Sequence, residues 1–182
     1  MNYNTVADIY ASIDETRGRF VARVETLSEA EQNFRPAEGH WSVAEIVEHL
    51  SLIEGGLTQL MGMMLNKIES AAGPPPETRH VEMAPFTLAH FIEQAREEKY
   101  QAPEIARPRG GVAIADSLAR MKDSRQRLHA LRPRVEARDL SAALYPHPAF
   151  GPLNLYQWLA FIGIHEARHL GQIERLLKTN DE

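Results

Sequence analysis

Three histidines of this chain have the type and spacing of metal ligands. His165 and His169 lie four residues apart in a segment with helical periodicity, and His49 lies in an earlier segment of the same kind. Residues four apart share one face of a helix, about one turn apart, so both imidazoles can bind one metal ion. A third imidazole from a neighbouring helix would leave one coordination position open for water or substrate. That arrangement is typical of a catalytic metal site rather than a closed structural one.

The three histidines also fall in phase with apolar stripes. His49 lies three residues after Ile46, His165 lies three after Ile162, and His169 continues the same stripe. Steps of three or four residues place side chains on the inward face of a helix. Buried polar groups are costly unless they find partners, and one shared metal would satisfy all three. The alternative is a set of core histidines that are satisfied by hydrogen bonds alone.

Two polar residues lie one helical turn from the expected ligands. Glu45 precedes His49 by four residues and could orient its ring, but its position after Ser42 favours a role in helix capping. Gln172 follows His169 by three residues and is a candidate to hold that ligand from behind.

No residue stands out as a general base. Glu166 is rotated by about 100° from its neighbour His165, which favours an exposed or interhelical charge. Arg125 could hold an anionic substrate, but a snorkelling arginine at the edge of a bundle is the preferred interpretation. The remaining histidines have no ligand-like spacing and are expected outside the site: His40, His80, His90, His129 and His147.

Composition narrows the class of protein. The 182 residues predict one domain, 1–182, with a substantial core. The absence of cysteine excludes disulfides, thiolate metal sites and a cysteine nucleophile, and fits a cytoplasmic protein. A net charge of −5 gives no basic surface for nucleic acid, so nucleic acid is not expected as a partner. No apolar stretch approaches the roughly 20 residues of a membrane span, and the first residues do not resemble a signal peptide.

Hydrophobic periodicity predicts an all-α, four-helix bundle. The expected helices cover about 5–27, a segment from Ser42 past Met64, about 115–131, and a segment from Asn154 past Leu177. Ser42 with Glu45 predicts a capping box, and Asn154 with Gln157 predicts a similar start for the last helix. Both histidine-bearing helices therefore have well-specified beginnings.

The segments between these helices are rich in proline and glycine. A long connection is expected between the second and third helices, at about 71–113, with one short helix at 88–100 inside it. A short turn or helix is expected at 28–34, and 144–153 is expected to form a turn-rich lead into the last helix. No alternating pattern predicts a β-strand.

Two motifs resemble those of the DinB superfamily, specifically its DinB-like (YfiT-type) branch. They are W-S-V-A-E-I-V-E-H-L at 41–50, and H-P-A-F-G at 147–151 followed by H-E-A-R-H-L-G-Q at 165–172. Ala102-Pro103-Glu104 lies between them, and the order of elements agrees over most of the chain. Each motif alone is weak, whereas their order is fairly specific.

The resemblance implies a four-helix bundle that binds a divalent metal through His49, His165 and His169. Zinc or nickel is the favoured metal, with iron or manganese as alternatives. The resemblance also implies a homodimer and a metal-dependent hydrolase or thiol (S-)transferase that acts on a small molecule or thiol. The alternative is a non-catalytic, metal-stabilised bundle that acts by dimerisation or ligand binding. Fold transfers between relatives better than activity, so both functions stay open.

Overall fold

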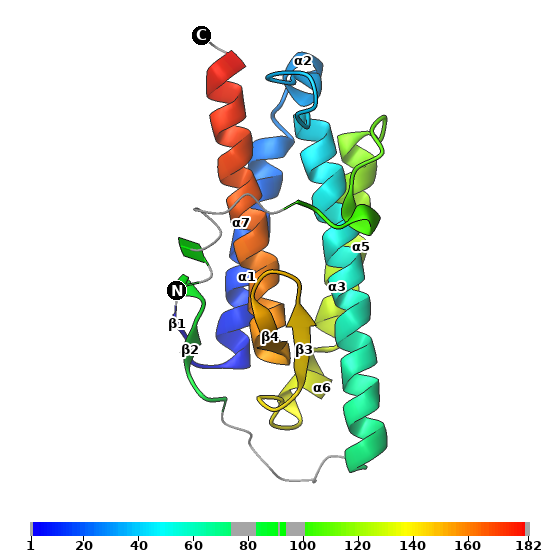
Figure 1. Ribbon diagram of the computed structural model, residues 1–182, viewed down its shortest axis with the longest axis vertical. Helices are drawn as coiled ribbons and strands as arrows, with labels where there is room; N and C mark the ends of the chain where they lie inside the picture. The colour runs from blue at the N-terminus through cyan, green and yellow to red at the C-terminus, as the bar shows by residue number, and fades with distance from the viewer. Residues whose placement is uncertain (1, 74–82, 91, 94–100, 181–182) are drawn as a thin grey trace.

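The computed structural model describes residues 2–73, 83–90, 92–93 and 101–180. Four long helices form a four-helix bundle, as the sequence predicted (Figure 1). They are α1 (Val6–Val24), α3 (Val43–Ala72), α5 (Ile114–Ala130) and α7 (Leu155–Asn180). Helix α3 packs against both α5 and α7, and α1 packs against α7.

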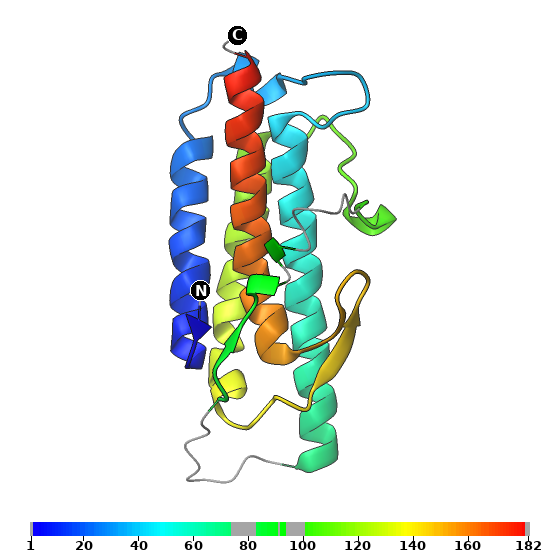
Figure 2. The same cartoon turned by 60° about the vertical axis from the view of Figure 1, so that its left-hand side comes forward.

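The direction of the helices explains the long connection. In Figures 1 and 2, α1 and α7 run one way along the bundle, whereas α3 and α5 run the other way. Helices α3 and α5 are consecutive among the four long helices and are packed neighbours, yet they are parallel. The chain between them must return from one end of the bundle to the other, which a short turn cannot achieve.

Both histidine-bearing helices begin as predicted. The Ser42 amide donates to Glu45 Oε2 at 2.7 Å, and the Glu45 amide donates to Ser42 Oγ at 3.3 Å. Asn154 and Gln157 exchange the same pair of hydrogen bonds, each at 2.9 Å. These bonds satisfy amides that a helix start leaves unpaired, and so they fix where α3 and α7 start.

The prediction that the chain has no strands is wrong at two short pairs. Strand β1 (Asn2–Tyr3) pairs antiparallel with β2 (Phe86–Thr87), and β3 (Leu144–His147) pairs antiparallel with β4 (Gly151–Asn154). In the second pair Pro146 lies opposite Pro152, so two residues without an N–H group occupy the middle of the ladder. Prolines normally argue against a strand, and for that reason the sequence did not predict this hairpin.

The minor helices lie in the connections. Helix α2 (Glu29–Asn33) occupies the segment where a short turn or helix was expected, and α6 (Arg132–Glu136) follows α5 directly. A 3-10 helix, η1 (Glu104–Ala106), lies just before α5. Of the helix expected at 88–100, residues 89–90 and 92–93 are helical, and most of the rest lies outside the described residues.

Two apolar clusters fill the bundle, one toward each end. One contains Ile9, Ile13, Leu65, Leu128 and Leu159, and the other contains Phe20, Val47, Met121 and Ile173 among their buried members. The long helices carry polar residues between these two clusters. We call this set the polar layer: Asp14, Arg17, His49, Glu54, Arg125, His165, Glu166 and His169. No helix in the described part of the chain is long and apolar enough to cross a membrane.

Candidate metal centre

The fold brings His49, His165 and His169 together. One ring nitrogen from each lies within 4.8 Å of the others, with His49 on α3 and the other two on α7. The Nε2 atoms of His165 and His169 are 3.2 Å apart. Two nitrogens bound tetrahedrally to one zinc ion, at about 2.0–2.1 Å each, would lie roughly 3.3 Å apart. The spacing of this pair therefore already matches that of two ligands on one metal.

In two of the rings, a hydrogen bond to Nδ1 determines which of the two ring nitrogens carries the proton. His49 Nδ1 lies 2.7 Å from the carbonyl oxygen of Ala106, and His169 Nδ1 lies 2.7 Å from Gln172 Oε1. Both partners are acceptors, so each Nδ1 carries the proton and donates it. The Nε2 atoms of both rings are then left with a lone pair toward the centre. This pattern, a ligand imidazole held through its other nitrogen, is usual around protein-bound metals.

Burial keeps the three imidazoles neutral. It lowers the pKa of His49, lowers that of His165 well below its usual range, and lowers that of His169 to about 3. The neighbouring histidines lower the pKa values of His165 and His169 further, because clustered positive charges would repel one another. Neutral imidazole is the form that binds metals.

The donor set fits a divalent metal ion. Without a proton or cation between them, the lone pairs of His165 Nε2 and His169 Nε2 would repel each other at 3.2 Å. Three imidazoles suit zinc, nickel, copper and iron rather than magnesium or calcium, which prefer oxygen ligands. Among the described residues, no carboxylate joins the three histidines in the cluster.

The segment before α5 is tied to α3 beside the first ligand. Glu48 is 3% exposed, and its carboxylate accepts hydrogen bonds from the amides of Arg109 and Gly110, both at 3.1 Å. Its neighbour His49 holds the carbonyl of Ala106. We call this arrangement the α3 tether. Sequence reasoning did not single out Glu48; the Ala102-Pro103-Glu104 motif marks this segment but does not show what it contacts.

Aromatic rings surround one side of the centre. Trp41 lies with its ring centroid 4.9 Å from that of His49, and Phe161 lies 5.6 Å from His165. His147, on β3, stacks against Phe150 at 4.5 Å and lies 4.8 Å from Phe161. We call Trp41, His147, Phe150 and Phe161 the aromatic rim, and all four are partly exposed. His147 is outside the histidine cluster, as expected, yet it contributes to this surrounding wall.

A cation lies close to all three histidines. Arg168 is exposed on α7, and its positive charge contributes to lowering the pKa of His49, His165 and His169. Within the part of the chain that the structure describes, Arg168 makes no hydrogen bond or ion pair. It was not singled out from the sequence, although its place between the two histidines of α7 is a signal that could have found it.

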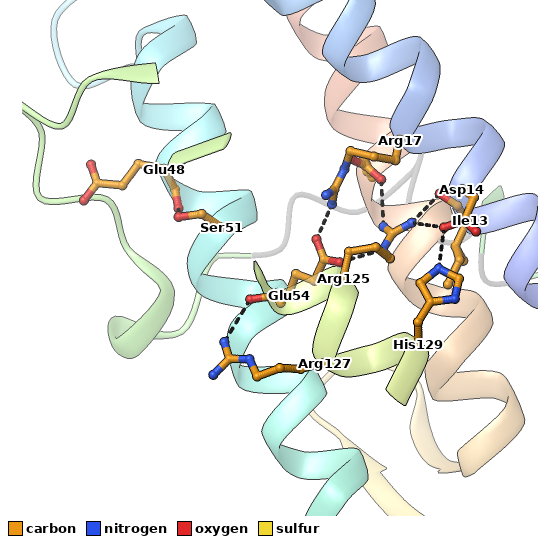
Figure 3. A network of polar contacts seen from close by, with 11 residues as sticks. Ile13, Asp14, Arg17, Glu48, Ser51, Glu54, Arg125, Arg127 and His129 are labelled. Atoms are coloured by element: carbon orange, nitrogen blue, oxygen red, sulfur yellow. Dashed lines mark hydrogen bonds and ion pairs between the residues drawn. The ribbon is translucent and has the colours of Figure 1, made fainter. Parts of the chain in front are cut away.

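Glu166, which follows His165 in the sequence, belongs to a buried group of charges, part of which Figure 3 shows. Arg125 donates from Nε to Glu54 Oε1 at 2.8 Å and lies 3.5 Å from Glu166 Oε2, while Arg17 pairs with both carboxylates. We call these four residues the ionic cluster. The interpretation of Arg125 as a snorkelling arginine is wrong, because it is 7% exposed and also donates to the carbonyl of Ile13. Glu166 is an interhelical charge, one of its two predicted roles.

The pKa values of the ionic cluster reflect burial against pairing. Burial disfavours the charged form of Arg125, but Glu54 and Glu166 outweigh it and raise the pKa of the guanidinium. Burial raises the pKa of the Glu166 carboxyl, and Arg17 and Arg125 oppose that rise. Both acids are thus committed to arginines, so neither is a free base for the metal centre.

Comparison with known proteins agrees with the fold and with the family resemblance of the sequence. A family model described as the DinB superfamily matches residues 12–173. The chain belongs to the DinB superfamily. It is 30% identical over 162 residues to the uncharacterized protein YuaE of Bacillus subtilis strain 168, covering 85% of this chain and 92% of that protein. The crystal structure of TT2238, described as a four-helix bundle protein, is similar in fold, with a TM-score of 0.63. The two chains are 18% identical, and the match covers 94% of this chain and 99% of the TT2238 chain.

Proposed function

We propose that this DinB-superfamily protein binds one divalent metal ion, zinc or nickel in preference to iron or manganese, through His49, His165 and His169. The observation that carries the proposal is the cluster of three neutral imidazoles within 4.8 Å of one another, two of them oriented from behind. Three protein ligands leave a position for a further ligand. A bound metal lowers the pKa of a water or thiol and polarises an electrophile.

Thiol transfer fits the surroundings of this centre better than hydrolysis does. Hydrolysis commonly uses a carboxylate or histidine as general base beside the metal. Here the cluster contains no carboxylate among the described residues, and Glu48, Glu54 and Glu166 are engaged by amides or arginines. A thiol bound to a metal would have a lowered pKa and could release its proton to solvent water, so it would not require a protein base. We therefore place a metal-dependent thiol (S-)transferase ahead of a hydrolase.

The residues around the three histidines favour a small anionic substrate with an apolar part. Arg168 offers an unpaired positive charge to such a substrate. The aromatic rim includes Phe161, whose ring lies beside that of His165, and its rings offer faces and edges to an apolar group. Together these features suit a thiol or its acceptor that carries a carboxylate.

One observation favours the alternative, non-catalytic function. The three ligands join α3 to α7, so a bound metal would hold these two helices together whether or not it reacts. In that role the metal stabilises the bundle, and the protein acts by dimerisation or by binding a ligand. A homodimer is a prediction of the family resemblance that applies equally to both functions.

Metal analysis of the purified protein tests the shared part of both functions. We expect about one divalent metal per chain in the wild type, and loss of most of it in His165→Ala and His169→Ala, since two ligands alone bind weakly. His129→Ala is the matched control, because His129 lies outside the cluster and pairs with Asp14. Full occupancy in both ligand variants would contradict the assignment.

Cobalt substitution separates the catalytic function from the structural one. If the metal has an open position, small thiols will change the visible spectrum of the cobalt protein, and turnover of thiols with electrophiles will require metal. An unchanged spectrum at saturating thiol would show that the metal is inaccessible, and the structural alternative would stand.

Substitution of Arg168 tests the substrate class. In Arg168→Gln we expect the KM for an anionic thiol to rise about tenfold with little change for a neutral one, since charged hydrogen bonds are worth about 1.5–3 kcal/mol. Arg175→Gln is the control, because Arg175 is also exposed on α7 but lies further along the helix. Equal KM values in both variants would remove Arg168 from the proposal.

A further inference from the structure

A small void separates the metal centre from the ionic cluster. Its volume is about 10 Å³, and its polar lining consists of Arg17, Glu54, His165 and Glu166. The rest of the lining is apolar: Leu50, Ile53, Met121 and Ile162. A cavity needs about 10–15 Å³ and two to four polar partners to hold one water molecule. This void meets the volume condition at its lower limit and has four polar residues in its lining.

His165 differs from the other two expected ligands. His49 and His169 each donate from Nδ1 to an acceptor, whereas no described residue makes a hydrogen bond to Nδ1 of His165. Its Nε2 atom faces His169. An imidazole bound to a metal almost always donates its other N–H to a carboxylate, a carbonyl or water. His165 therefore needs an acceptor for its Nδ1–H group when a metal is bound. The void, which His165 lines, is where such an acceptor could lie.

The two carboxylates at the void have room for another donor. Glu54 and Glu166 are 3% and 2% exposed. Glu54 Oε1 accepts from Arg125 at 2.8 Å, and Glu166 Oε1 accepts from Arg17 at 2.5 Å. A carboxylate oxygen can accept more than one hydrogen bond, so these contacts do not saturate either group.

We propose that the void holds one water molecule, which in the metal-bound protein accepts a hydrogen bond from Nδ1–H of His165 and donates to the carboxylates of Glu54 and Glu166. This inference rests on the proposed metal centre. It makes Glu54 and Glu166 positioning residues that orient the third ligand and increase its basicity through the water. It also gives the ionic cluster a role, because Arg17 and Arg125 hold both carboxylates in place beside the void.

The proposal predicts a change of tautomer at His165. Because His169 carries its proton on Nδ1, we expect the His165 proton of the metal-free protein on Nε2, from which it would be donated to the lone pair of His169 Nε2, 3.2 Å away. A metal takes the Nε2 lone pair of His165, so the neutral ring must then carry its proton on Nδ1. One proton leaves Nε2 to solvent and one is taken up at Nδ1, so the ring stays neutral.

Nitrogen NMR of the wild type tests this directly. With histidine labelled by ¹⁵N, the ring nitrogens of His165 should change from the Nε2–H to the Nδ1–H pattern when zinc is added. His49 and His169 should keep Nδ1–H throughout. A His165 ring without a proton on Nδ1 in the zinc-loaded protein would overturn the inference, and this measurement needs no variant to fold.

Isosteric variants test the two carboxylates. We expect Glu54→Gln and Glu166→Gln to bind zinc about 10- to 100-fold more weakly in competition with a chelator, the usual effect of losing such support. Asp14→Asn is the matched control, since Asp14 also pairs with Arg125 but does not line the void. It should bind zinc as the wild type does.

The outcomes separate this inference from the metal centre itself. If the wild type binds no metal, the proposed centre falls and the inference falls with it. If the wild type binds zinc but all three variants show the same affinity as it does, the centre stands and only the water bridge is wrong.

Discussion

At His169 a single hydrogen bond decides which ring nitrogen faces the other two histidines of the proposed metal site. Gln172 Oε1 lies 2.7 Å from His169 Nδ1, which fixes the ring and leaves Nε2 for the metal. The sequence placed Gln172 one turn beyond His169, on the same face, and the structure confirms the contact.

Substitution of Gln172 should therefore weaken metal binding without removing a ligand. In Gln172→Leu we expect zinc affinity to fall by about tenfold or more, because loss of such an acceptor leaves the imidazole free to rotate. Gln172→Glu keeps an acceptor and should restore or exceed wild-type affinity. Chelator competition measures both. Equal weakening in the two variants would mean that the acceptor is irrelevant.

At the level of single residues, the sequence was informative where the signal was local. The phases of His49, His165 and His169 are visible in an apolar stripe, because helical periodicity acts over a few residues. The carbonyl of Ala106, which holds His49, lies 57 residues away and has no side-chain signature at all. Arg125 was misinterpreted for the same reason: its partners come from α1, α3 and α7, far away in the sequence.

At the level of elements, the α3 tether joins a connection to a ligand-bearing helix. Glu48 and His49 are consecutive, and each holds a different part of the segment before α5. A shift of this segment would therefore move the acceptor behind His49.

Removal of the Glu48 carboxylate should release the tether locally. In Glu48→Ala the amides of Arg109 and Gly110 lose their acceptor, and a hydrogen bond to a charged group contributes about 1.5–3 kcal/mol. We expect hydrogen exchange of these two amides to become at least tenfold faster. Ser51→Ala is the control, because the Ser51 hydroxyl is buried on the same helix but bonds only to the Glu48 carbonyl. Unchanged exchange in Glu48→Ala would argue against the tether.

The elements themselves were predictable in proportion to their length. The helix expected at 115–131 runs from Ile114 to Ala130, and the capping pair Ser42 and Glu45 marks the start of α3. Long periodic segments carry many residues of evidence, and N-terminal caps add a local start signal. The hairpin of β3 and β4 has only four residues per strand and two facing prolines, so neither alternation nor propensity revealed it.

For the whole molecule, the polar layer divides the core into two apolar parts. The layer joins α1, α3, α5 and α7 through the ionic cluster and the histidines, whereas the apolar clusters lie on either side of it. Buried charges stabilise little by themselves, but removal of one partner leaves the others unpaired.

Arg125 should therefore be one of the most sensitive positions in the bundle. In Arg125→Met we expect a loss of about 3–5 kcal/mol in the free energy of unfolding, because Glu54 and Glu166 each lose a buried cation. Arg127→Met is the control; its pair with Asp123 is exposed, with side chains 61% and 64% accessible, and should cost at most about 1 kcal/mol. Urea unfolding of both variants compares them, and similar losses would contradict the role given to the layer.

His49 is far from His165 and His169 along the chain, so a metal bound to all three would also cross-link distant segments. His49 precedes His165 by 116 residues (165 − 49), so a metal bound to both closes a loop that contains most of the protein. The unfolded chain keeps only the local pair His165 and His169, and a ligand that prefers the native state stabilises it by about 2.7 kcal/mol at 100 times its Kd. In a chain without cysteine, the ion would act as a removable cross-link. A chelator should lower the melting temperature of the zinc-loaded protein, and returned zinc should restore it.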